Sequence, residues 1–262
     1  MIRWALRVLA GALGIALAVY VAPAPVHSPS GRPVAAPSSS TPTPSPPPAP
    51  LAGLVLALDP GHQLGNHDFP EQINRLVPAG GFRKACNTTG TESAAGVPEA
   101  TVTWRITRLV QARLQDLGAT VRLTRSGNSE HRWGPCVDAR GRFGARVGAR
   151  LMVSVHADGA PPADHGFHVI ARPGQARSLR LARALRAGFD EHGLARSSYV
   201  GGGSALSLRS DLATLNLSTV PVAMLEIGNM ANPADAHRMT SRAGEARYAA
   251  AIVAGIRSFF HR

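Results

Sequence analysis

The stretch Leu-Val-Leu-Ala-Leu-Asp-Pro-Gly-His, at positions 54–62, constrains the fold more than any other part of this 262-residue chain. Its apolar half, residues 54–58, is typical of a buried strand, and Asp-Pro-Gly ends that strand in a tight turn. We therefore expect His62 at the carboxyl end of a strand, the edge at which open α/β sheets bind ligands. Taken alone, a histidine in this position is equally compatible with an ordinary surface residue.

The rest of the folded part alternates between strand and helix patterns. Apolar runs predict further strands at residues 120–124, 151–155, 166–171 and 221–227. Helical periodicity predicts helices at residues 98–117, 137–150, 176–191 and 242–260. Residues 63–97 are polar and glycine-rich and are expected to form a long loop. This alternation predicts a single α/β domain with a mainly parallel, twisted sheet and helices on both faces.

Four side chains at strand ends or a helix start are candidates for a catalytic site. His62, His156 and Glu99 provide two imidazoles and one carboxylate, the ligand set of many catalytic zinc sites. Glu226 lies in an apolar strand, where an ionised carboxylate is costly to bury without a partner, and it is a candidate general base. Glu99 alone could instead serve only the dipole of the helix that it opens. Rival ligands, which we expect in polar loops, are His67, His165 and His168.

Residues 1–28 indicate an export signal or an N-terminal membrane anchor. Arg3 and Arg7 precede the apolar stretch 8–22, which is short for a membrane-spanning helix. Because no clear cleavage site follows, a cleaved signal peptide and an uncleaved anchor both stay open. Residues 29–50 are rich in proline, serine and threonine and predict an unfolded linker, either a spacer or a disordered tail. The folded catalytic domain is expected at residues 51–262.

Cys86 and Cys136 are the only two cysteines. An even count in an exported chain favours a disulfide bond between them over two free thiols. Closing a loop of this length stabilises a protein by roughly 4 kcal/mol on the chain-entropy model. A metal site built on cysteine is not indicated, because neither residue belongs to a Cys-x-x-Cys pair.

The chain carries a net charge of +12, almost entirely from arginine. Such a charge favours polyanionic partners. Nucleic acid is a poor candidate, because the chain is expected to be exported and, at 5% aromatic residues, shows no basic stripe interleaved with aromatic side chains. Attraction to anionic cell-wall polymers is the favoured interpretation.

Five motifs together resemble the zinc-dependent N-acetylmuramoyl-L-alanine amidases of the third amidase family, which are bacterial cell-wall hydrolases. The motifs are Leu-Asp-Pro-Gly-His62, Glu99 opening a helix that leads to Val-Arg-Leu-Thr-Arg125, Ser-Val-His156-Ala-Asp, Arg209-Ser-Asp-Leu-Ala-Thr-Leu-Asn216, and Val-Ala-Met-Leu-Glu226-Ile-Gly-Asn-Met-Ala-Asn232. The resemblance spans about residues 52–260. It implies zinc (Zn²⁺) held by His62, Glu99 and His156, with Glu226 as the catalytic glutamate. On the same resemblance, Arg209 and Asn216 either contact the substrate peptide or order their loop.

The implied reaction is hydrolysis of the amide bond between the lactyl group of N-acetylmuramic acid and the L-alanine of the peptidoglycan stem peptide. A zinc-activated water attacks, and Glu226 is the general base. From the N-terminal segment we expect export to the periplasm or cell wall, with the domain either secreted or attached to the membrane only through that segment, and our default expectation for the oligomeric state is a monomer. Two alternatives stay open: another zinc peptidase acting within the stem peptide, and a catalytically inactive wall-binding module.

Overall fold

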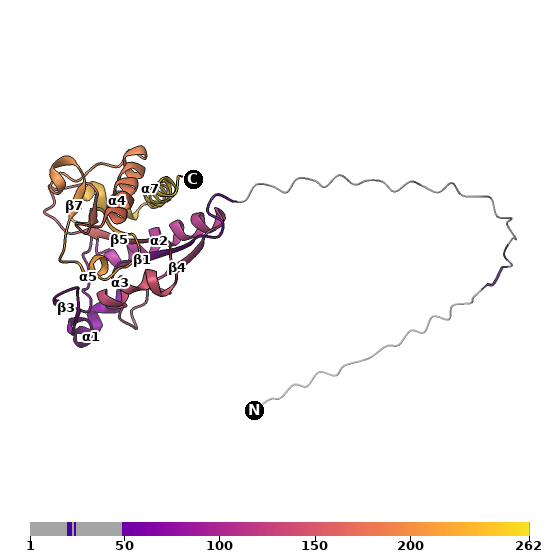
Figure 1. Ribbon diagram of the computed structural model, residues 1–262, viewed down its shortest axis with the longest axis horizontal. Helices are drawn as coiled ribbons and strands as arrows, with labels where there is room; N and C mark the ends of the chain where they lie inside the picture. Colours follow the sequence, from indigo (N-terminus) through magenta and orange to yellow (C-terminus); the bar gives the residue numbers. More distant parts are fainter. Residues whose placement is uncertain (1–19, 23, 25–48, 262) are drawn as a thin grey trace, which may run out of the picture. The chain divides into compact units, whose positions relative to one another are not determined.

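Strand β1 (Val55–Pro60) lies inside a six-stranded sheet with the order β4-β1-β5-β8-β6-β7 (Figure 1). The other strands are β4 (Thr120–Leu123), β5 (Met152–Asp158), β6 (His168–Ala171), β7 (Leu206–Leu208) and β8 (Val222–Asn229). All neighbouring strands pair in parallel except β6 and β8, which are antiparallel. The prediction of a mainly parallel sheet is therefore confirmed, and the carboxyl ends of β1, β5 and β8 meet at one edge.

The structure is a computed structural model that describes residues 20–22, 24 and 49–261. The predicted signal or anchor at 1–28 and the predicted linker at 29–50 lie almost entirely outside the described residues. Within the described part, no helix combines the length and the apolar character that crossing a bilayer requires.

Helices cover both faces of the sheet, as predicted. On one face lie the long helices α2 (Glu99–Asp116), α4 (Ala176–Glu191) and α7 (Arg242–Phe259). The opposite face carries α3 (Val137–Arg146) and the short α5 (Ala213–Asn216). Side chains alternate between the faces of a strand. Leu56 and Leu58 of β1 accordingly belong to the larger apolar core, whereas Ala57 between them packs in the smaller core with Phe143 of α3.

The boundaries of two helices follow from local chemistry. Helix α2 buries Val102, Ile106, Val110 and Leu114, which recur every four residues and form one apolar stripe. Gly118 follows it with a φ of +91°, a backbone conformation that suits glycine at a helix end. Helix α3 ends at Arg146, four residues earlier than predicted, because Gly148 takes a φ of +65°.

The prediction that residues 63–97 form one long loop is wrong. This segment contains the 3-10 helix η1 (Leu64–Asp68), helix α1 (Pro70–Asn74) and an antiparallel hairpin of β2 (Leu76–Pro78) and β3 (Arg83–Ala85). These elements are too short to produce a periodic sequence pattern, and one disulfide helps to hold them in place. The predicted disulfide is present and joins Cys86, directly after β3, to Cys136, directly before α3. Further short elements absent from the predictions are β7, α5, η2 (Gly201–Gly203) and α6 (Pro233–Thr240).

Candidate metal centre

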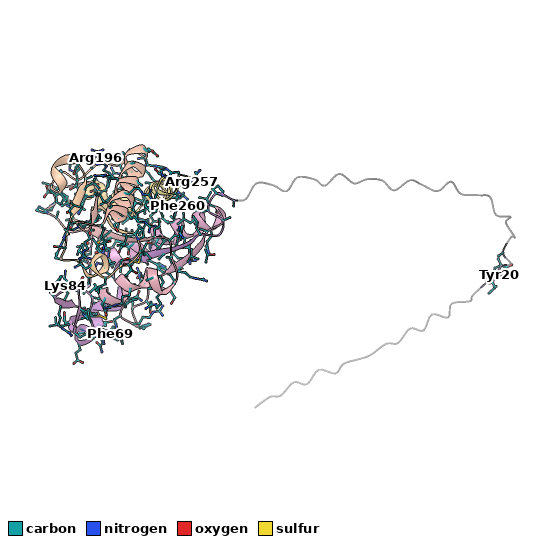
Figure 2. All side chains as sticks on the ribbon, in the orientation of Figure 1. Tyr20, Phe69, Lys84, Arg196, Arg257 and Phe260 are labelled. Carbon is teal, nitrogen blue, oxygen red and sulfur yellow. A yellow bond between two sulfur atoms is a disulfide. The ribbon has the colours of Figure 1, made fainter. Side chains whose placement is uncertain are left out.

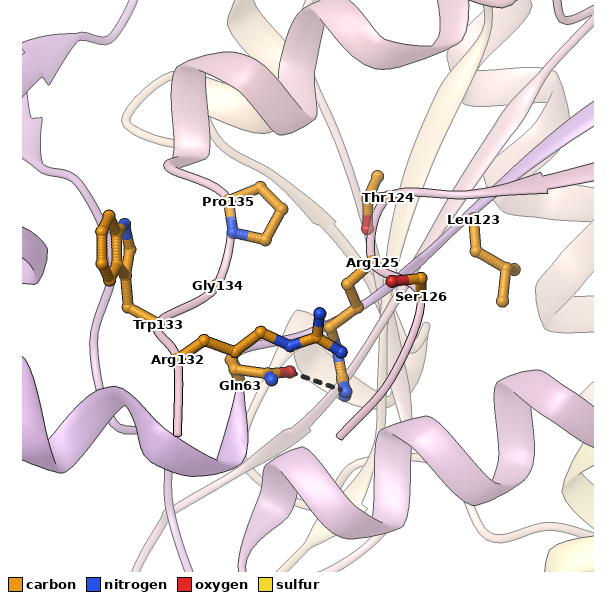
Figure 3. A pocket seen from close by; sticks show the side chains of 9 residues that line it. All are labelled: Gln63, Leu123, Thr124, Arg125, Ser126, Arg132, Trp133, Gly134 and Pro135. Atoms are coloured by element: carbon orange, nitrogen blue, oxygen red, sulfur yellow. Dashed lines mark hydrogen bonds between the residues drawn. The ribbon is translucent and has the colours of Figure 1, made fainter. Parts of the chain in front are cut away.

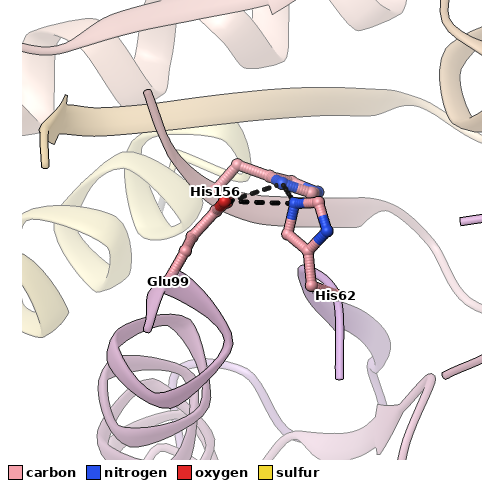
Figure 4. A group of neighbouring side chains, drawn as sticks. All are labelled: His62, Glu99 and His156. Atoms are coloured by element: carbon pink, nitrogen blue, oxygen red, sulfur yellow. Dashed lines mark hydrogen bonds and ion pairs between the residues drawn. The ribbon is translucent and has the colours of Figure 1, made fainter. Parts of the chain in front are cut away.

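Three predicted ligands converge at the carboxyl edge of the sheet. His62 follows β1, His156 lies in the neighbouring parallel strand β5, and Glu99 is the first residue of α2 (Figure 4). One ligand atom from each residue lies within 4.8 Å of the others. Nε2 of His62 is 3.1 Å from Oε2 of Glu99, and Nδ1 of His156 is 3.0 Å from Oε1 of the same carboxylate. The two imidazole nitrogens are 3.2 Å apart. This spacing brings two nitrogens and a carboxylate to one point.

The imidazole of His62 is oriented by a backbone carbonyl. Its Nδ1 atom lies 3.0 Å from the carbonyl oxygen of Thr88, so an N–H at this position donates to that oxygen. This hydrogen bond leaves the lone pair of Nε2 facing the cluster. A metal-binding histidine usually donates such a hydrogen bond from its other ring nitrogen. His62 has a φ of +55°, in the left-handed region that non-glycine residues seldom adopt. Such backbone strain persists only where the surroundings enforce it.

Two buried arginines enforce the turn that carries His62. The carbonyl of Pro60 accepts hydrogen bonds from Nε of Arg125 at 3.0 Å and from Nη1 of Arg140 at 2.9 Å. The next two carbonyls are also bound, that of Gly61 by Nη2 of Arg125 at 3.3 Å and that of His62 by Nη2 of Arg140 at 2.8 Å. We call these two side chains the arginine clamp. Arg125 also donates to Oε1 of Gln63, at 3.2 Å, on the wall of a neighbouring pocket (Figure 3).

The two arginines differ in how their charge is compensated. Arg140 forms a buried ion pair with Asp59, which also accepts from Ser154 at 2.7 Å and from Thr124 at 2.5 Å. Burial alone would raise the pKa of Asp59, but Arg140 and these hydroxyl groups outweigh it, and the pKa falls below its ordinary value. Arg125 contacts only neutral acceptors, and burial together with the charge of Arg140 lowers its pKa to about 9. Two cations thus hold the turn that follows β1. One of them, Arg140, is neutralised by the carboxylate of Asp59 in β1.

Both oxygens of Glu99 are fixed by backbone amides. The N–H of Ala157 donates to Oε1 and the N–H of Thr91 donates to Oε2, each at 3.0 Å. Burial opposes ionisation, but His62 and His156 hold the pKa of Glu99 well below its usual range. The carboxylate is therefore anionic and shared between two imidazoles. This donor set fits a divalent cation such as zinc.

Two glycines leave room for the ligands. A Cβ atom on Gly61 would lie 2.5 Å from the imidazole of His156. One on Gly90, whose φ is +84°, would lie 2.7 Å from Oε2 of Glu99. Any larger residue at either position would therefore displace a ligand. The sequence shows the first glycine within Asp-Pro-Gly-His, but nothing around Gly90 points to this role.

Glu226 lies beside the three ligands. It is on β8, in register with His156 of β5 on one side and with His168 of β6 on the other. Burial raises its pKa well above the ordinary value, and the carboxylates of Glu99 and Asp158 raise it further. Glu226 therefore binds a proton more readily than a solvent-exposed glutamate does. A general base that works near neutral pH needs such a raised pKa.

Two pockets meet at His62, His156 and Glu226. The first, of about 220 Å³, extends past these residues to Lys84 and the apolar side chains of Leu212 and Met224. The second, of about 290 Å³, extends to Asp158 and to a polar loop of three threonines, Thr88, Thr89 and Thr91. Both pockets therefore open onto the same cluster.

The rival histidines lie apart from the ligand cluster. His67 is in η1, where its ring faces Asp68 and Glu130 at 3.4 and 3.7 Å. His165 lies in a loop, as expected. The prediction of a polar loop is wrong for His168, which is buried in β6 and stacks edge-on against Tyr199. Burial lowers the pKa of His168 to about 4, so this histidine is neutral at pH 7.

Arg209 makes a local ion pair, whereas Asn216 joins its loop to a distant hairpin. Arg209 donates to both carboxylate oxygens of Asp211, at 2.9 and 2.6 Å. Nδ2 of Asn216 donates to the carbonyls of Ala79 and Ser210, each at 2.8 Å, and so ties the loop to the turn of the β2–β3 hairpin. Neither residue lines the two pockets at the ligand cluster. A role for them in substrate binding stays a prediction.

Comparison with known proteins supports the family suggested by the motifs. The family described as N-acetylmuramoyl-L-alanine amidase (Amidase_3) matches residues 56–258. The chain is 40% identical over 216 residues to N-acetylmuramoyl-L-alanine amidase Rv3717 of Mycobacterium tuberculosis, covering 80% of this chain and 87% of the relative.

Solved structures show the same relationship. The fold matches the N-acetylmuramyl-L-alanine amidase Ami1 from Mycobacterium smegmatis with a TM-score of 0.76 at 38% identity, over 80% of this chain and 98% of that one. It matches the apo form of Ami1 from Mycobacterium abscessus with a TM-score of 0.75, also at 38% identity, over 80% of this chain and all of that one (100%). The predicted family is thereby confirmed. The chain belongs to the Amidase_3 family of N-acetylmuramoyl-L-alanine amidases.

Proposed function

We propose that this hydrolase cleaves the amide bond between the lactyl group of N-acetylmuramic acid and the L-alanine of the peptidoglycan stem peptide, with one zinc ion bound by His62, Glu99 and His156. The observation that carries the proposal is the convergence of one ligand atom from each residue within 4.8 Å. Two imidazoles and a carboxylate leave a fourth position free for water or substrate, as catalytic zinc sites require.

A zinc ion bound by His62, Glu99 and His156 would lower the pKa of water and polarise an amide carbonyl. The protein's own proton carrier is Glu226, whose raised pKa makes its ionised form a strong proton acceptor. Glu226 takes a proton from the attacking water as the new carbon–oxygen bond forms. It then returns that proton to the nitrogen of L-alanine as the carbon–nitrogen bond breaks. The products are a free lactyl carboxylate and a free peptide amine.

The remaining residues of the centre hold this machinery in place. The carbonyl of Thr88 fixes the tautomer of His62, and the amides of Thr91 and Ala157 fix the two oxygens of Glu99. Fixed ligands keep the geometry ready before substrate arrives, which lowers the reorganisation needed in the reaction.

A digest of purified muropeptides tests the proposal. We expect the wild type to release a lactyl-muramic acid end and a peptide beginning with L-alanine, both visible by mass spectrometry. Cleavage between two amino acids would instead identify a zinc peptidase, and the absence of any product from zinc-loaded protein would favour a wall-binding module. Glu226→Gln should abolish turnover and keep its zinc, whereas the exposed-site variant Glu71→Gln should behave as wild type.

We also propose that the chain works in the cell envelope. Residues 1–28 serve as a signal peptide or membrane anchor, residues 29–50 as a linker, and residues 51–262 as the catalytic domain of a monomer. The net charge of +12 supports a non-specific attraction to anionic cell-wall polymers. High salt should weaken binding to isolated walls, because it screens exposed charges.

A further inference from the structure

The two pockets that meet at the ligand cluster differ in their charged side chains. Lys84 lines the first pocket and Asp158 lines the second. We propose, on the basis of the function above, that Lys84 binds the carboxylate of the residue that follows L-alanine in the stem peptide. The enzyme then prefers stem peptides in which this carboxylate is free rather than amidated.

Lys84 has an ammonium group available for an anion. It is the only lysine of the chain and lies half-buried on β3, where Figure 2 labels it. Its Nζ donates to a neutral acceptor, the backbone carbonyl of Asp211, at 3.0 Å. The carboxylate of Asp211 is occupied on both oxygens by Arg209. Within residues 49–261 Lys84 forms no ion pair, and two of its three N–H donors remain for a ligand.

The other cation of this pocket is already neutralised. Arg140 is buried against Asp59, and its remaining donors bind backbone carbonyls of Pro60, His62 and Pro135. Outside the ligand cluster, Lys84 is therefore the positive charge of this lining that an entering anion can pair with. The lining of this pocket also includes the apolar side chains of Leu212 and Met224, which suit the methyl group of L-alanine.

The second pocket suits the sugar and repels the peptide carboxylate. Asp158 contributes a negative charge there and accepts a hydrogen bond from the hydroxyl of Tyr199 at 3.0 Å. Hydroxyl groups of Thr89 and Thr91, which line the second pocket and not the first, offer partners to a polyhydroxylated ring. A carboxylate on this side would lie near Asp158, and like charges repel. These charges favour a substrate orientation with the peptide toward Lys84 and the glycan toward Asp158.

Steady-state kinetics of the full chain on two synthetic substrates test this inference. Both are N-acetylmuramoyl-L-alanyl dipeptides, and the second residue carries either a free α-carboxylate or the corresponding carboxamide. We expect the wild type to favour the carboxylate by about 5- to 10-fold in kcat/KM, chiefly through a lower KM, as the replacement of one charged hydrogen bond by a neutral one implies. In Lys84→Gln the ratio should fall to about one, and Lys84→Arg should restore most of it.

The matched control is Arg83→Gln, which removes one positive charge from the exposed neighbour on the same strand. This variant should keep the wild-type ratio. A wild-type ratio of one, or a ratio that Lys84→Gln leaves unchanged, would overturn the role of Lys84 while the amidase activity on both substrates stands. Failure of the wild type to cleave either substrate would count instead against the proposed function.

Discussion

Arg125 and Arg140 donate to one and the same acceptor, the carbonyl oxygen of Pro60, at 3.0 and 2.9 Å. Both guanidinium groups are almost completely buried, with 6% and 2% of each residue exposed. Between them they bind three successive carbonyls and so hold His62 in a left-handed backbone conformation. The position of a proposed metal ligand is thus fixed by two cations that lie outside the ligand cluster.

Weakening the arginine clamp should lower zinc affinity. Arg140→Lys keeps the charge beside Asp59 but removes the fork of donors that reaches both Pro60 and His62. We expect zinc affinity to fall about 10- to 100-fold, the usual effect of losing a group that orients a metal ligand. Competition with a chromogenic chelator measures this affinity.

The control for the clamp is Arg142→Lys on the same helix. Arg142 is half-exposed and pairs only with Asp138, so this variant should bind zinc as the wild type does. Circular dichroism should show native helix content for both variants. Equal zinc affinity in Arg140→Lys and Arg142→Lys would exclude the clamp from metal binding.

Gly90→Ala should displace a ligand. The new methyl group would lie 2.7 Å from Oε2 of Glu99 and 3.0 Å from the ring of His62. Gly96→Ala is a matched control, because Gly96 has a similar φ of +72° and open space around it. Both variants should lose stability by about 1–3 kcal/mol from backbone strain. Only Gly90→Ala should also lose zinc, as measured by metal analysis after gel filtration. Equal zinc content in the two variants would show that a methyl group at position 90 does not displace a ligand.

The Asp59–Arg140 pair should make stability depend on pH in the acidic range. The native pKa of Asp59 lies below its ordinary value, so the folded protein binds this proton less readily than the unfolded chain. The resulting stabilisation is complete above the unfolded pKa of about 3.9 and is lost as the pH falls through the lower native pKa. Asp59→Asn removes this dependence.

We expect Asp59→Asn to be less stable at pH 7 by about 3–5 kcal/mol, because Arg140 then stays buried without its counter-charge. At pH 3 and below the difference from the wild type should shrink. Urea unfolding of the wild type and of Asp59→Asn at pH 7 and at pH 2 measures the stability difference at each pH. A deficit that is the same at pH 7 and at pH 2 would show that the ion pair is not the source of the acid sensitivity.

Much of the fold and of the centre is predictable because the pattern is strong. Apolar runs that end in a histidine place His62 and His156 at neighbouring strand ends, and Glu99 opens a helix whose apolar stripe is plain. The disulfide follows from the presence of only two cysteines in a chain expected to be exported. These features depend on burial and periodicity, which the order of residues records directly.

The missed features depend on contacts that carry no periodic signal. The hairpin that holds Lys84 has strands of three residues each, and a disulfide and backbone hydrogen bonds stabilise it. The arginine clamp acts on backbone carbonyls, which every residue possesses, so nothing in the sequence assigns Arg125 or Arg140 to them. His168 lies within the strand predicted at 166–171, but nothing in the sequence shows that its side chain is buried where β6 pairs with β8.

The central claim is that His62, Glu99 and His156 hold one zinc ion next to Glu226. Anomalous diffraction from crystals of the zinc-loaded protein, collected on both sides of the zinc absorption edge, tests it directly. We predict a single strong peak about 2.0–2.2 Å from Nε2 of His62, from Nδ1 of His156 and from the carboxylate of Glu99. A peak bound by other residues, or no peak at this cluster at full zinc loading, would contradict the claim.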